Sequence, residues 1–247
     1  MGTIFFLILF PLVVAFVLLV VKADAARGAI VKFAAIIIAA ASIYLAVQYF
    51  RTGDQYFDFH NEAVNYIMMV IEALLAIYII ITGIRHKKYL ASVFAIIQTP
   101  LLIWFELTKG HHIEVVSNMY IDRLSVIMVL IIGIIGTLIC VYALGYMKDF
   151  QHHHAGEKDR RPWFFFVMFL FLAAMFGLVT SNNLIWMYFF WEITSLSSFF
   201  LIGYTKTKEA TNNAFRALMG EALAAYNAAG WPGKVSVYLD FHSDADI

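Results

Sequence analysis

Residues 183–204 read NLIWMYFFWEITSLSSFFLIGY, an apolar run with one glutamate, Glu192, near its centre. A helix of ~20 apolar residues crosses the hydrocarbon core of a bilayer, so this run is long enough to span a membrane with Glu192 at mid-depth. An acid at that depth is energetically costly and commonly belongs to a proton or ion pathway. The run therefore predicts a membrane helix and marks Glu192 as the first candidate functional residue.

The composition of the whole chain is typical of a protein with several membrane helices. Hydrophobic residues make up 62% of the sequence, charged residues make up 14%, and the mean hydropathy is +0.80. Soluble domains are about half apolar and about a quarter charged. The net charge is zero, and no basic patch indicates nucleic acid. Cys140, the one cysteine, lies in an apolar run, so we expect it to pack between helices.

Seven apolar segments are predicted to span the membrane as helices, because continuous apolar runs favour helices over the alternating strands of a barrel. The fourth segment is short and carries Gln98 and Pro100, which favours a kink or shielding by neighbouring helices. The predicted fold class is an all-α, polytopic transmembrane helix bundle of about seven spanning helices, with a partial eighth. The segments are residues 3–21, 29–50, 63–84, 89–105, 120–147, 162–181 and 183–204.

The basic residues alternate strongly between successive connections. The odd-numbered connections hold thirteen Lys and Arg residues and the even-numbered ones hold three. The positive-inside rule then predicts a multi-pass protein of the cell (inner) membrane, with the odd connections in the cytoplasm and the N-terminus outside. The odd set is Lys22, Arg27, Lys32, Arg85, Lys87, Lys88, Lys148, Lys158, Arg160, Arg161, Lys206, Lys208 and Arg216, and the even set is Arg51, Lys109 and Arg123.

The sequence changes character after Arg216. Residues 217–230 are rich in alanine and carry Glu221, whereas residues 231–247 are polar and rich in turn-forming residues. We therefore divide the chain into a membrane region, residues 1–216, and an atypical C-terminal tail, residues 217–247, which we expect in the cytoplasm. A chain truncated or altered at its end would have the same appearance.

Two intramembrane acids are candidate proton-relay residues. Ser195 lies one turn from Glu192 on the same helix face, and a cation to pair with Glu192 would have to come from another helix. The alternative for Glu192 is a structural carboxyl, protonated and bonded to a neighbouring helix. Glu72 lies in the third segment, where Asn65 could extend a polar path across the bilayer centre. Equally, Glu72 could be a lone acid packed against a partner subunit.

Other charged residues have simpler interpretations. Asp122 and Arg123 begin the fifth segment, where an acid–base pair is typical of an anchor at the membrane surface. Lys206, Lys208 and Arg216 follow the acid-bearing segment and are expected to determine topology. They could also tune the electrostatic potential around Glu192.

The sequence predicts neither a metal site nor a bound cofactor. His152, His153 and His154 are consecutive, so they do not share one face of a helix or strand, and no further ligand stands at a suitable spacing. The chain has no CxxC, phosphate-binding loop or dinucleotide fingerprint. We therefore expect no nucleotide, flavin or iron–sulfur centre, and no redox active site, in this polypeptide.

Two stretches together resemble the antiporter-like membrane subunits, of the L/M type, of NADH:quinone oxidoreductase (complex I). Residues 120–150 have a D-x-L-S start at Asp122 and a G-Y-M ending. Residues 163–216 contain N-N-L, then W-E-x-x-S-L-x-S around Glu192, then L-I-G-Y and N-N-A-x-R-A-L. Related subunits occur in Mrp-type cation/proton antiporters and in membrane-bound hydrogenases.

The resemblance implies a subunit that moves protons, or Na⁺, across the membrane, while other polypeptides carry the redox chemistry. Its partners would be the lipid bilayer and the other membrane subunits of a complex I-like NADH dehydrogenase, hydrogenase or Mrp-type assembly. Glu192 stands at the position of the family's intramembrane glutamate, which is thought to pair with a lysine on a later helix. Asp122 also matches a family position.

The chain departs from the family pattern in two places. The helices predicted at 63–84 and 89–105 look like additions to the plainest family members. No lysine lies in a predicted membrane core, and the pattern is left after Met219, so the chain resembles the N-terminal part of such a subunit. An alternative function is a structural or assembly subunit without transport activity. A stand-alone secondary transporter is disfavoured, because no inverted repeat is visible.

Overall fold

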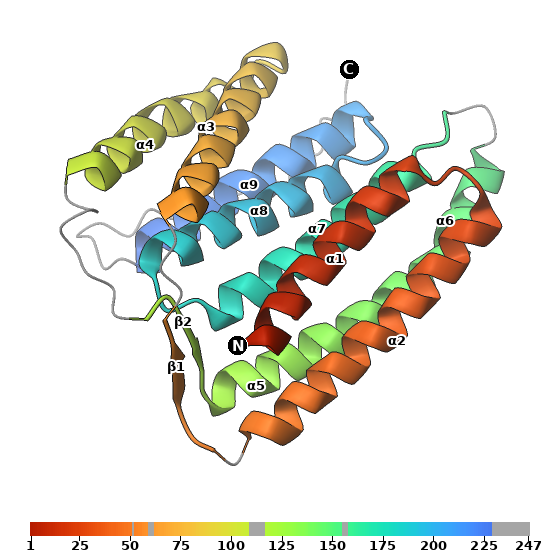
Figure 1. The fold of residues 1–247 in the computed structure, drawn as a ribbon. Helices are drawn as coiled ribbons and strands as arrows, with labels where there is room; N and C mark the ends of the chain where they lie inside the picture. Colours follow the sequence, from red (N-terminus) through yellow and green to blue (C-terminus); the bar gives the residue numbers. More distant parts are fainter. Residues whose placement is uncertain (51, 59–61, 109–116, 155–157, 229–247) are drawn as a thin grey trace.

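The computed structural model describes residues 1–50, 52–58, 62–108, 117–154 and 158–228, and most of them are helical (Figure 1). The elements in chain order are α1 (Gly2–Val20), α2 (Asp24–Tyr49), β1 (Gln55–Phe57), α3 (Glu62–Arg85), α4 (Tyr89–Thr108), β2 (Met119–Ile121), α5 (Arg123–Leu130), the π-helical turn η2 (Ile131–Gly136), α6 (Thr137–His153), α7 (Arg161–Thr180), α8 (Leu184–Ile202) and α9 (Lys208–Ala228).

The predicted all-α polytopic bundle is confirmed. Within the described residues, six helices are long and apolar enough to cross a membrane: α1, α2, α3, the rod formed by α5, η2 and α6, α7, and α8. Helix α4, the fourth predicted segment, continues through Pro100 to Thr108, and its apolar part within the described residues, Tyr89–Pro100, is shorter than a membrane span. Helix α9 continues through the predicted boundary at residues 216 and 217. Residues 229–247, most of the predicted tail, lie outside the described residues.

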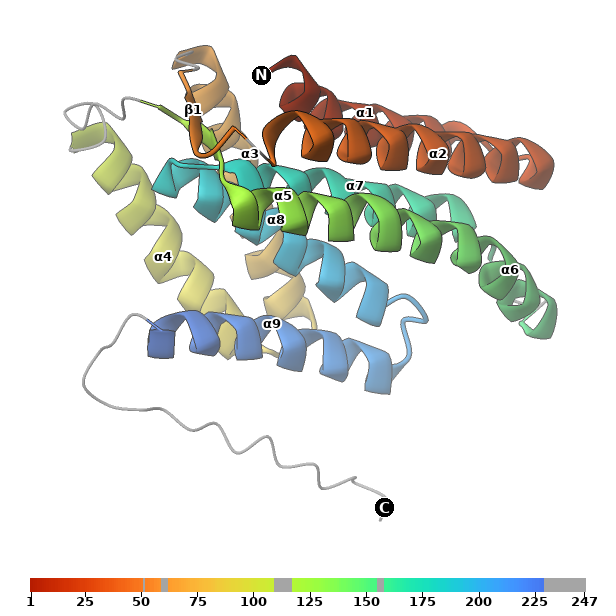
Figure 2. The same ribbon diagram turned by 90° about the horizontal axis from the view of Figure 1, so that it is seen from below.

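Helix α7 lies at the centre of the bundle. Helices α1 and α8 pack along it, and α2 packs against α1 and the α5–η2–α6 rod (Figures 1 and 2). The sequence of α7 is apolar on all sides, as expected for a helix surrounded by other helices. Its side chains Phe165, Phe169 and Phe176 are almost fully buried. This helix therefore supports α8, the helix that carries Glu192, along one side.

A close approach between α2 and the α5–η2–α6 rod occurs at the π-helical turn. A Cβ atom at Gly133 would overlap the side chain of Ser42, which is fully buried in α2. The hydroxyl of Thr137 donates a hydrogen bond of 2.6 Å to the carbonyl of Gly133. Glycine is therefore needed at position 133, because the Ser42 side chain of α2 occupies the space that a Cβ atom would fill.

Two short strands lie at one end of the bundle. Strands β1 and β2 pair antiparallel, with Tyr56 opposite Tyr120, and Met119 of β2 also forms a bridge with Ser181 at the end of α7. The pair was not predicted, because each strand has only three residues. It joins the connection that leaves α2 to the one that enters α5 and to the turn between α7 and α8.

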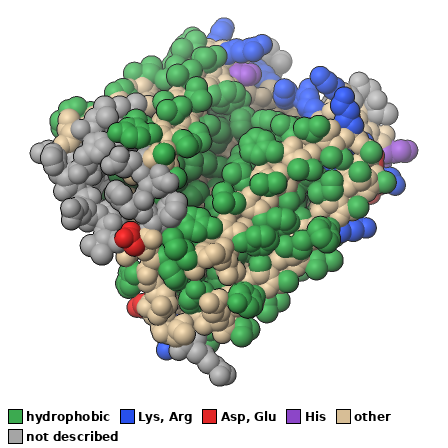
Figure 3. All heavy atoms as spheres, viewed as in Figure 1, with side chains coloured by type: hydrophobic (Ala, Val, Ile, Leu, Met, Phe, Trp, Pro, Cys, Tyr) green, Lys and Arg blue, Asp and Glu red, His purple; other side chains and the backbone are tan. Residues whose placement is uncertain are grey.

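The basic connections gather at the opposite end. Figure 1 places the connections α1–α2, α3–α4, α6–α7 and α8–α9 at one end of the bundle, and the strands and the α7–α8 turn at the other. Most Lys and Arg side chains visible in Figure 3 lie along the upper and right-hand rim, beside a broad hydrophobic face. The four connections around which the sequence analysis found most of the basic residues thus lie at one end of the molecule.

An ion-pair network fixes the helices at this basic end. Asp24, at the start of α2, accepts hydrogen bonds from Arg27 at 2.8 Å and from Arg161, at the start of α7, at 2.9 Å. Arg161 also pairs with Asp159 at 2.8 Å, and this hydrogen bond holds the pKa of the Asp159 carboxyl below its usual value. Arg27 is buried. Of the predicted topology residues, Arg161 therefore also ties α7 to α2, and Arg27 binds Asp24 within α2.

The contact between α7 and α8 generates a first prediction. A Cβ atom at Gly177 would collide with the ring of Phe190 on α8, whereas Gly145 on α6 has open space around it. We expect Gly177→Ala to lower the free energy of unfolding by about 1–3 kcal/mol, the typical effect of overpacking. The measurement is unfolding of the purified chain in mild detergent, followed by circular dichroism.

Gly145→Ala is the matched control, because it makes the same change within a helix without a collision. It should be neutral or stabilising by up to about 1 kcal/mol, since alanine favours helix. Equal stability of the two variants would contradict the close packing of α7 on α8.

Candidate functional site

The site is built on the first turn of α8, which two asparagines hold in place. Asn183 caps the helix, because its side-chain oxygen accepts a hydrogen bond of 2.9 Å from the amide of Ile185. Its side-chain nitrogen donates a buried hydrogen bond of 2.8 Å to Asn118. Asn182 donates to the carbonyl of Ser117 at 2.9 Å. The N-N-L part of the sequence motif therefore anchors α8 to the segment that enters β2.

Glu192 lies midway along α8 and is bound by a tyrosine. It stands eight residues after Leu184, where the helix begins, which corresponds to about 12 Å along the axis. The hydroxyl of Tyr188, one turn earlier, donates a hydrogen bond to Oε1 of Glu192. The carboxyl is half-buried. Among the described residues, its hydrogen-bond donor is thus Tyr188, and not Ser195.

Tyr188 connects Glu192 to the hairpin formed by α3 and α4. The side-chain nitrogen of Gln98, on α4, donates a hydrogen bond to the hydroxyl of Tyr188. An electrostatic interaction reaches Tyr188 from Glu72, which is buried midway along α3. The two acids predicted as relay residues therefore both interact with the same phenol. Their association with Tyr188 and Gln98 is a finding of the structure.

Asn65 attaches α3 to the beginning of α8. Its side-chain oxygen accepts a hydrogen bond of 2.9 Å from the indole nitrogen of Trp186. The sequence predicts that Asn65 extends a polar path together with Glu72. In the structure Asn65 bonds to Trp186, two residues before Tyr188. It therefore helps to place α3 beside the helix that carries the acid.

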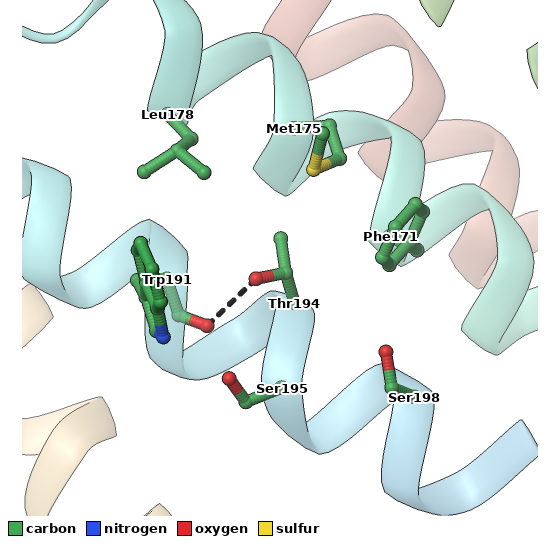
Figure 4. A pocket seen from close by; sticks show the side chains of 7 residues that line it. All are labelled: Phe171, Met175, Leu178, Trp191, Thr194, Ser195 and Ser198. Atoms are coloured by element: carbon green, nitrogen blue, oxygen red, sulfur yellow. Dashed lines mark hydrogen bonds between the residues drawn. The ribbon is translucent and has the colours of Figure 1, made fainter. Parts of the chain in front are cut away.

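Ser195 lines an open pocket between α7 and α8. The pocket has a volume of about 280 Å³ and is lined by Phe171, Met175, Leu178, Trp191, Thr194, Ser195 and Ser198. Figure 4 shows the apolar side chains of α7 facing the hydroxyl groups of α8, with Thr194 donating to the carbonyl of Trp191 at 2.7 Å. The pocket is thus beside the acid site, and Glu192 is not among its lining residues.

No cation pairs with Glu192 within the described residues, since the ion pairs found there involve Asp24 and Asp159. Lys206 and Lys208 follow the end of α8 at Ile202, ten residues and about 15 Å beyond Glu192. They are exposed, as is Arg216 on α9. Direct pairing with Glu192 is therefore not part of this arrangement, and their influence on its potential stays a prediction.

Asp122 caps α5. Its carboxylate accepts a hydrogen bond of 2.7 Å from the backbone amide of Ser125, and this bond holds the pKa of Asp122 below its usual value despite some desolvation. The neighbouring Arg123 is exposed. The sequence predicts an acid–base anchor at this position. The structure gives Asp122 a specific function at the helix start, which an Asx residue before an apolar run could have indicated.

The three histidines lie at and beyond the end of α6. His152 and His153 are in its last turn and His154 follows it. Within the part of the chain that the structure describes, no group of His, Cys, Asp or Glu side chains could hold a metal ion. The absence of a cofactor stays a prediction.

The sequence matches two protein families. Residues 104–156 match the family of NADH-ubiquinone oxidoreductase (complex I), chain 5 N-terminus, and residues 181–227 match the family of NADH:quinone oxidoreductase/Mrp antiporter membrane regions. The second match includes Glu192, Ser195 and the basic residues after α8, and the first includes Asp122. The second match ends at residue 227 and therefore continues past Met219. The departure from the family pattern that the sequence analysis predicted after Met219 was thus placed too early. Glu72 lies outside both matches.

Curated relatives agree with these families. The Na(+)/H(+) antiporter subunit A1 of Staphylococcus haemolyticus is 34% identical over 123 residues, which cover 50% of this chain and 14% of that protein. A putative antiporter subunit mnhA2 of Staphylococcus aureus is 33% identical over 142 residues, or 57% of this chain and 15% of that protein. The chain thus aligns with only about one seventh of the length of these relatives.

The cap of α5 generates a second prediction. Asp122→Ala should lower the free energy of unfolding by about 1 kcal/mol, because the Ser125 amide loses its acceptor. Asp122→Asn should retain most of the stability, since asparagine also caps helices. Because the pKa of Asp122 is lowered by folding, the advantage of aspartate over asparagine should be present above about pH 4 and be lost as the pH falls further.

Unfolding of the three proteins at neutral and acidic pH measures this difference. Asp149→Ala, an exposed acid in α6, is the control and should have little effect. A loss of stability in Asp122→Asn as large as in Asp122→Ala would show that the charge, rather than the cap, dominates.

Proposed function

We propose that this chain is one of the antiporter-like membrane subunits of complex I- and Mrp-type assemblies, which two of its stretches match, and that it takes part in proton translocation with Glu192 as the proton-binding carboxyl. The transported ion would be H⁺, or Na⁺ in exchange for H⁺. The chain would act together with other membrane subunits, and other polypeptides would supply the redox chemistry or the coupling ion.

The main support is the setting of Glu192. The carboxyl stands at the middle of an apolar helix, where an acid is costly unless it serves an ion pathway. It lies in the segment that matches the membrane family of complex I and Mrp antiporters. It also has a hydroxyl partner that can remain bound while the acid gains or loses a proton. A carboxyl with these properties is suited to binding a proton at mid-depth and releasing it again.

Glu72 is proposed as a second acid on the same route. It is buried midway along α3, and it interacts electrostatically with Tyr188, the hydrogen-bond donor to Glu192. A proton could therefore pass between the α3 and α8 regions by way of water or of hydroxyl groups. Within the described residues no ion pair links a lysine to Glu192, so we assign any such cation to a partner segment.

The orientation of the chain is also a proposal. The connections that gather thirteen basic residues share one end of the bundle, and basic ends face the cytoplasm. We therefore place the α1–α2, α3–α4, α6–α7 and α8–α9 connections in the cytoplasm, and the N-terminus and the two strands outside, in the cell membrane.

Replacement of the acid tests the proposed function. In the assembly that co-purifies with the tagged chain from mild detergent, Glu192→Gln should abolish ion-coupled proton movement, because an amide cannot carry the proton. The measurement is proton uptake into proteoliposomes, followed with a pH-sensitive dye. Membrane insertion and assembly should be unchanged, since glutamine keeps the shape of the side chain and can still accept from Tyr188.

Glu209→Gln, on the exposed start of α9, is the matched control and should transport normally. Undiminished proton uptake in a correctly assembled Glu192→Gln complex would remove the relay and favour a structural subunit. Identification of the co-purified proteins also shows which kind of assembly the chain belongs to.

Accessibility to a membrane-impermeant thiol reagent tests the orientation. Cys140 is the one cysteine and is buried, so Cys140→Ala provides a background in which single cysteines can be introduced. In intact cells, Thr52→Cys should react, whereas Lys87→Cys and His153→Cys should react only after the cells are opened. The reverse pattern would invert the proposed topology.

A further inference from the structure

A continuous chain of hydrogen bonds runs from α4 to the acid of α8. Gln98 donates to the hydroxyl of Tyr188, and Tyr188 donates to Glu192. A phenol has a single proton to donate, together with lone pairs that accept. When the amide of Gln98 occupies the accepting side of Tyr188, the phenol proton is directed to the carboxylate. The hydrogen bond on Glu192 is therefore set by a residue that does not touch it.

We propose that Gln98 is a positioning residue for Glu192, acting through Tyr188, and that the α3–α4 hairpin thereby controls how the acid is hydrogen-bonded. The influence of Gln98 on the hydrogen bond of Glu192 follows from the contacts alone. Its effect on proton transport rests on the function proposed above. Gln98 and most of α4 lie outside the two family matches, which begin at residue 104. The influence of Gln98 on Glu192 thus comes from a part of the α3–α4 hairpin that neither family match includes.

The chemistry of the glutamine amide suits both protonation states of the acid. With Glu192 ionised, the Gln98 amide donates to the hydroxyl of Tyr188, and that hydroxyl donates to the carboxylate. When Glu192 gains a proton, it can donate to the oxygen of Tyr188, whose own proton then turns toward Gln98. A half-turn of the amide presents its carbonyl oxygen as the acceptor. No proton leaves Tyr188 or Gln98 in this reversal, and every member of the chain keeps a partner.

The packing of the α3–α4 hairpin holds Gln98 next to Tyr188. Helix α3 packs against α4 and contacts α8, and α4 contacts α9, while both lie at the edge of the molecule (Figures 1 and 2). Asn65 and Trp186 fix α3 to the start of α8 with a hydrogen bond of 2.9 Å. An amide at membrane depth has few partners other than those in the protein, so the bond to Tyr188 is favoured over an unpaired Gln98.

Infrared spectroscopy of the chain in lipid bicelles tests the proposal. The carboxyl C=O stretching band of protonated Glu192 is assigned by its loss in Glu192→Gln. We expect Tyr188→Phe to move this band to higher frequency, because the carboxyl group loses its hydrogen-bond partner. We expect Gln98→Leu to move it by a smaller amount, because Tyr188 remains but is no longer oriented by the amide. The double variant should move it no further than Tyr188→Phe alone, since Gln98 acts only through Tyr188.

Controls separate this effect from a change of fold. Tyr78→Phe removes a phenol oxygen from the same hairpin and should leave the band in place. The ring centroids of Tyr78 and Phe200 are 5.5 Å apart, so this variant keeps a ring contact between α3 and α8. Gln98→Met keeps the length of the side chain and replaces Gln98→Leu if that variant does not fold. An unmoved band in folded Gln98→Leu or Gln98→Met protein would overturn the positioning role.

Transport measurements distinguish this inference from the proposed function. In the purified assembly, Gln98→Leu should lower the rate of proton uptake by up to about tenfold, the upper effect expected for losing one hydrogen bond between neutral groups. If Glu192→Gln abolishes uptake but Gln98→Leu leaves the band unmoved, the positioning role alone fails. If Glu192→Gln transports normally and the band still moves in Gln98→Leu, the proposed function fails while the hydrogen-bond chain stands.

Discussion

The buried hydrogen bond between Asn118 and Asn183 is the contact on which the acid site depends. Helix α8 is continuous from Leu184, so fixing its first turn sets both the depth and the rotation of every residue that follows. Asn183 also caps that turn, which means that one side chain begins the helix and attaches it to its neighbour. Two turns later the same helix presents Tyr188 and Glu192 toward the α3–α4 hairpin. A displacement at the asparagines would therefore carry the carboxyl with it.

Much of the fold could be predicted, because a bilayer leaves the chain few alternatives. Backbone groups in lipid must bond within their own helix, so continuous apolar runs become helices, and basic residues cannot easily be moved across. These two constraints predicted the bundle and the set of connections that share one end. The strands β1 and β2 could not be predicted in this way, since three residues on each side carry no measurable periodicity.

The candidate site was predicted only in part. Glu192 and Glu72 were identifiable as acids within apolar runs, whereas nothing in a single sequence says which helix faces which neighbour. Tyr188 stands one turn before Glu192 and could have been proposed as its partner from helical spacing. Gln98 could not, because its bond to Tyr188 joins residues ninety positions apart. Asn183 resembled part of a family motif, and its structural purpose became clear only from its hydrogen bonds with Asn118 and with the amide of Ile185.

The antiparallel pairing of β1 with β2 has a consequence for how the α3–α4 hairpin is joined to the bundle. Because Phe57 lies opposite Met119, the chain departs from the bundle and rejoins it at adjacent points. Helices α3 and α4 lie between those points, so the other helices keep their order and their connections to one another independently of this hairpin. The polar neighbour that reaches the acid site through Tyr188, Gln98, is thus carried by a hairpin that begins and ends at a single strand pair.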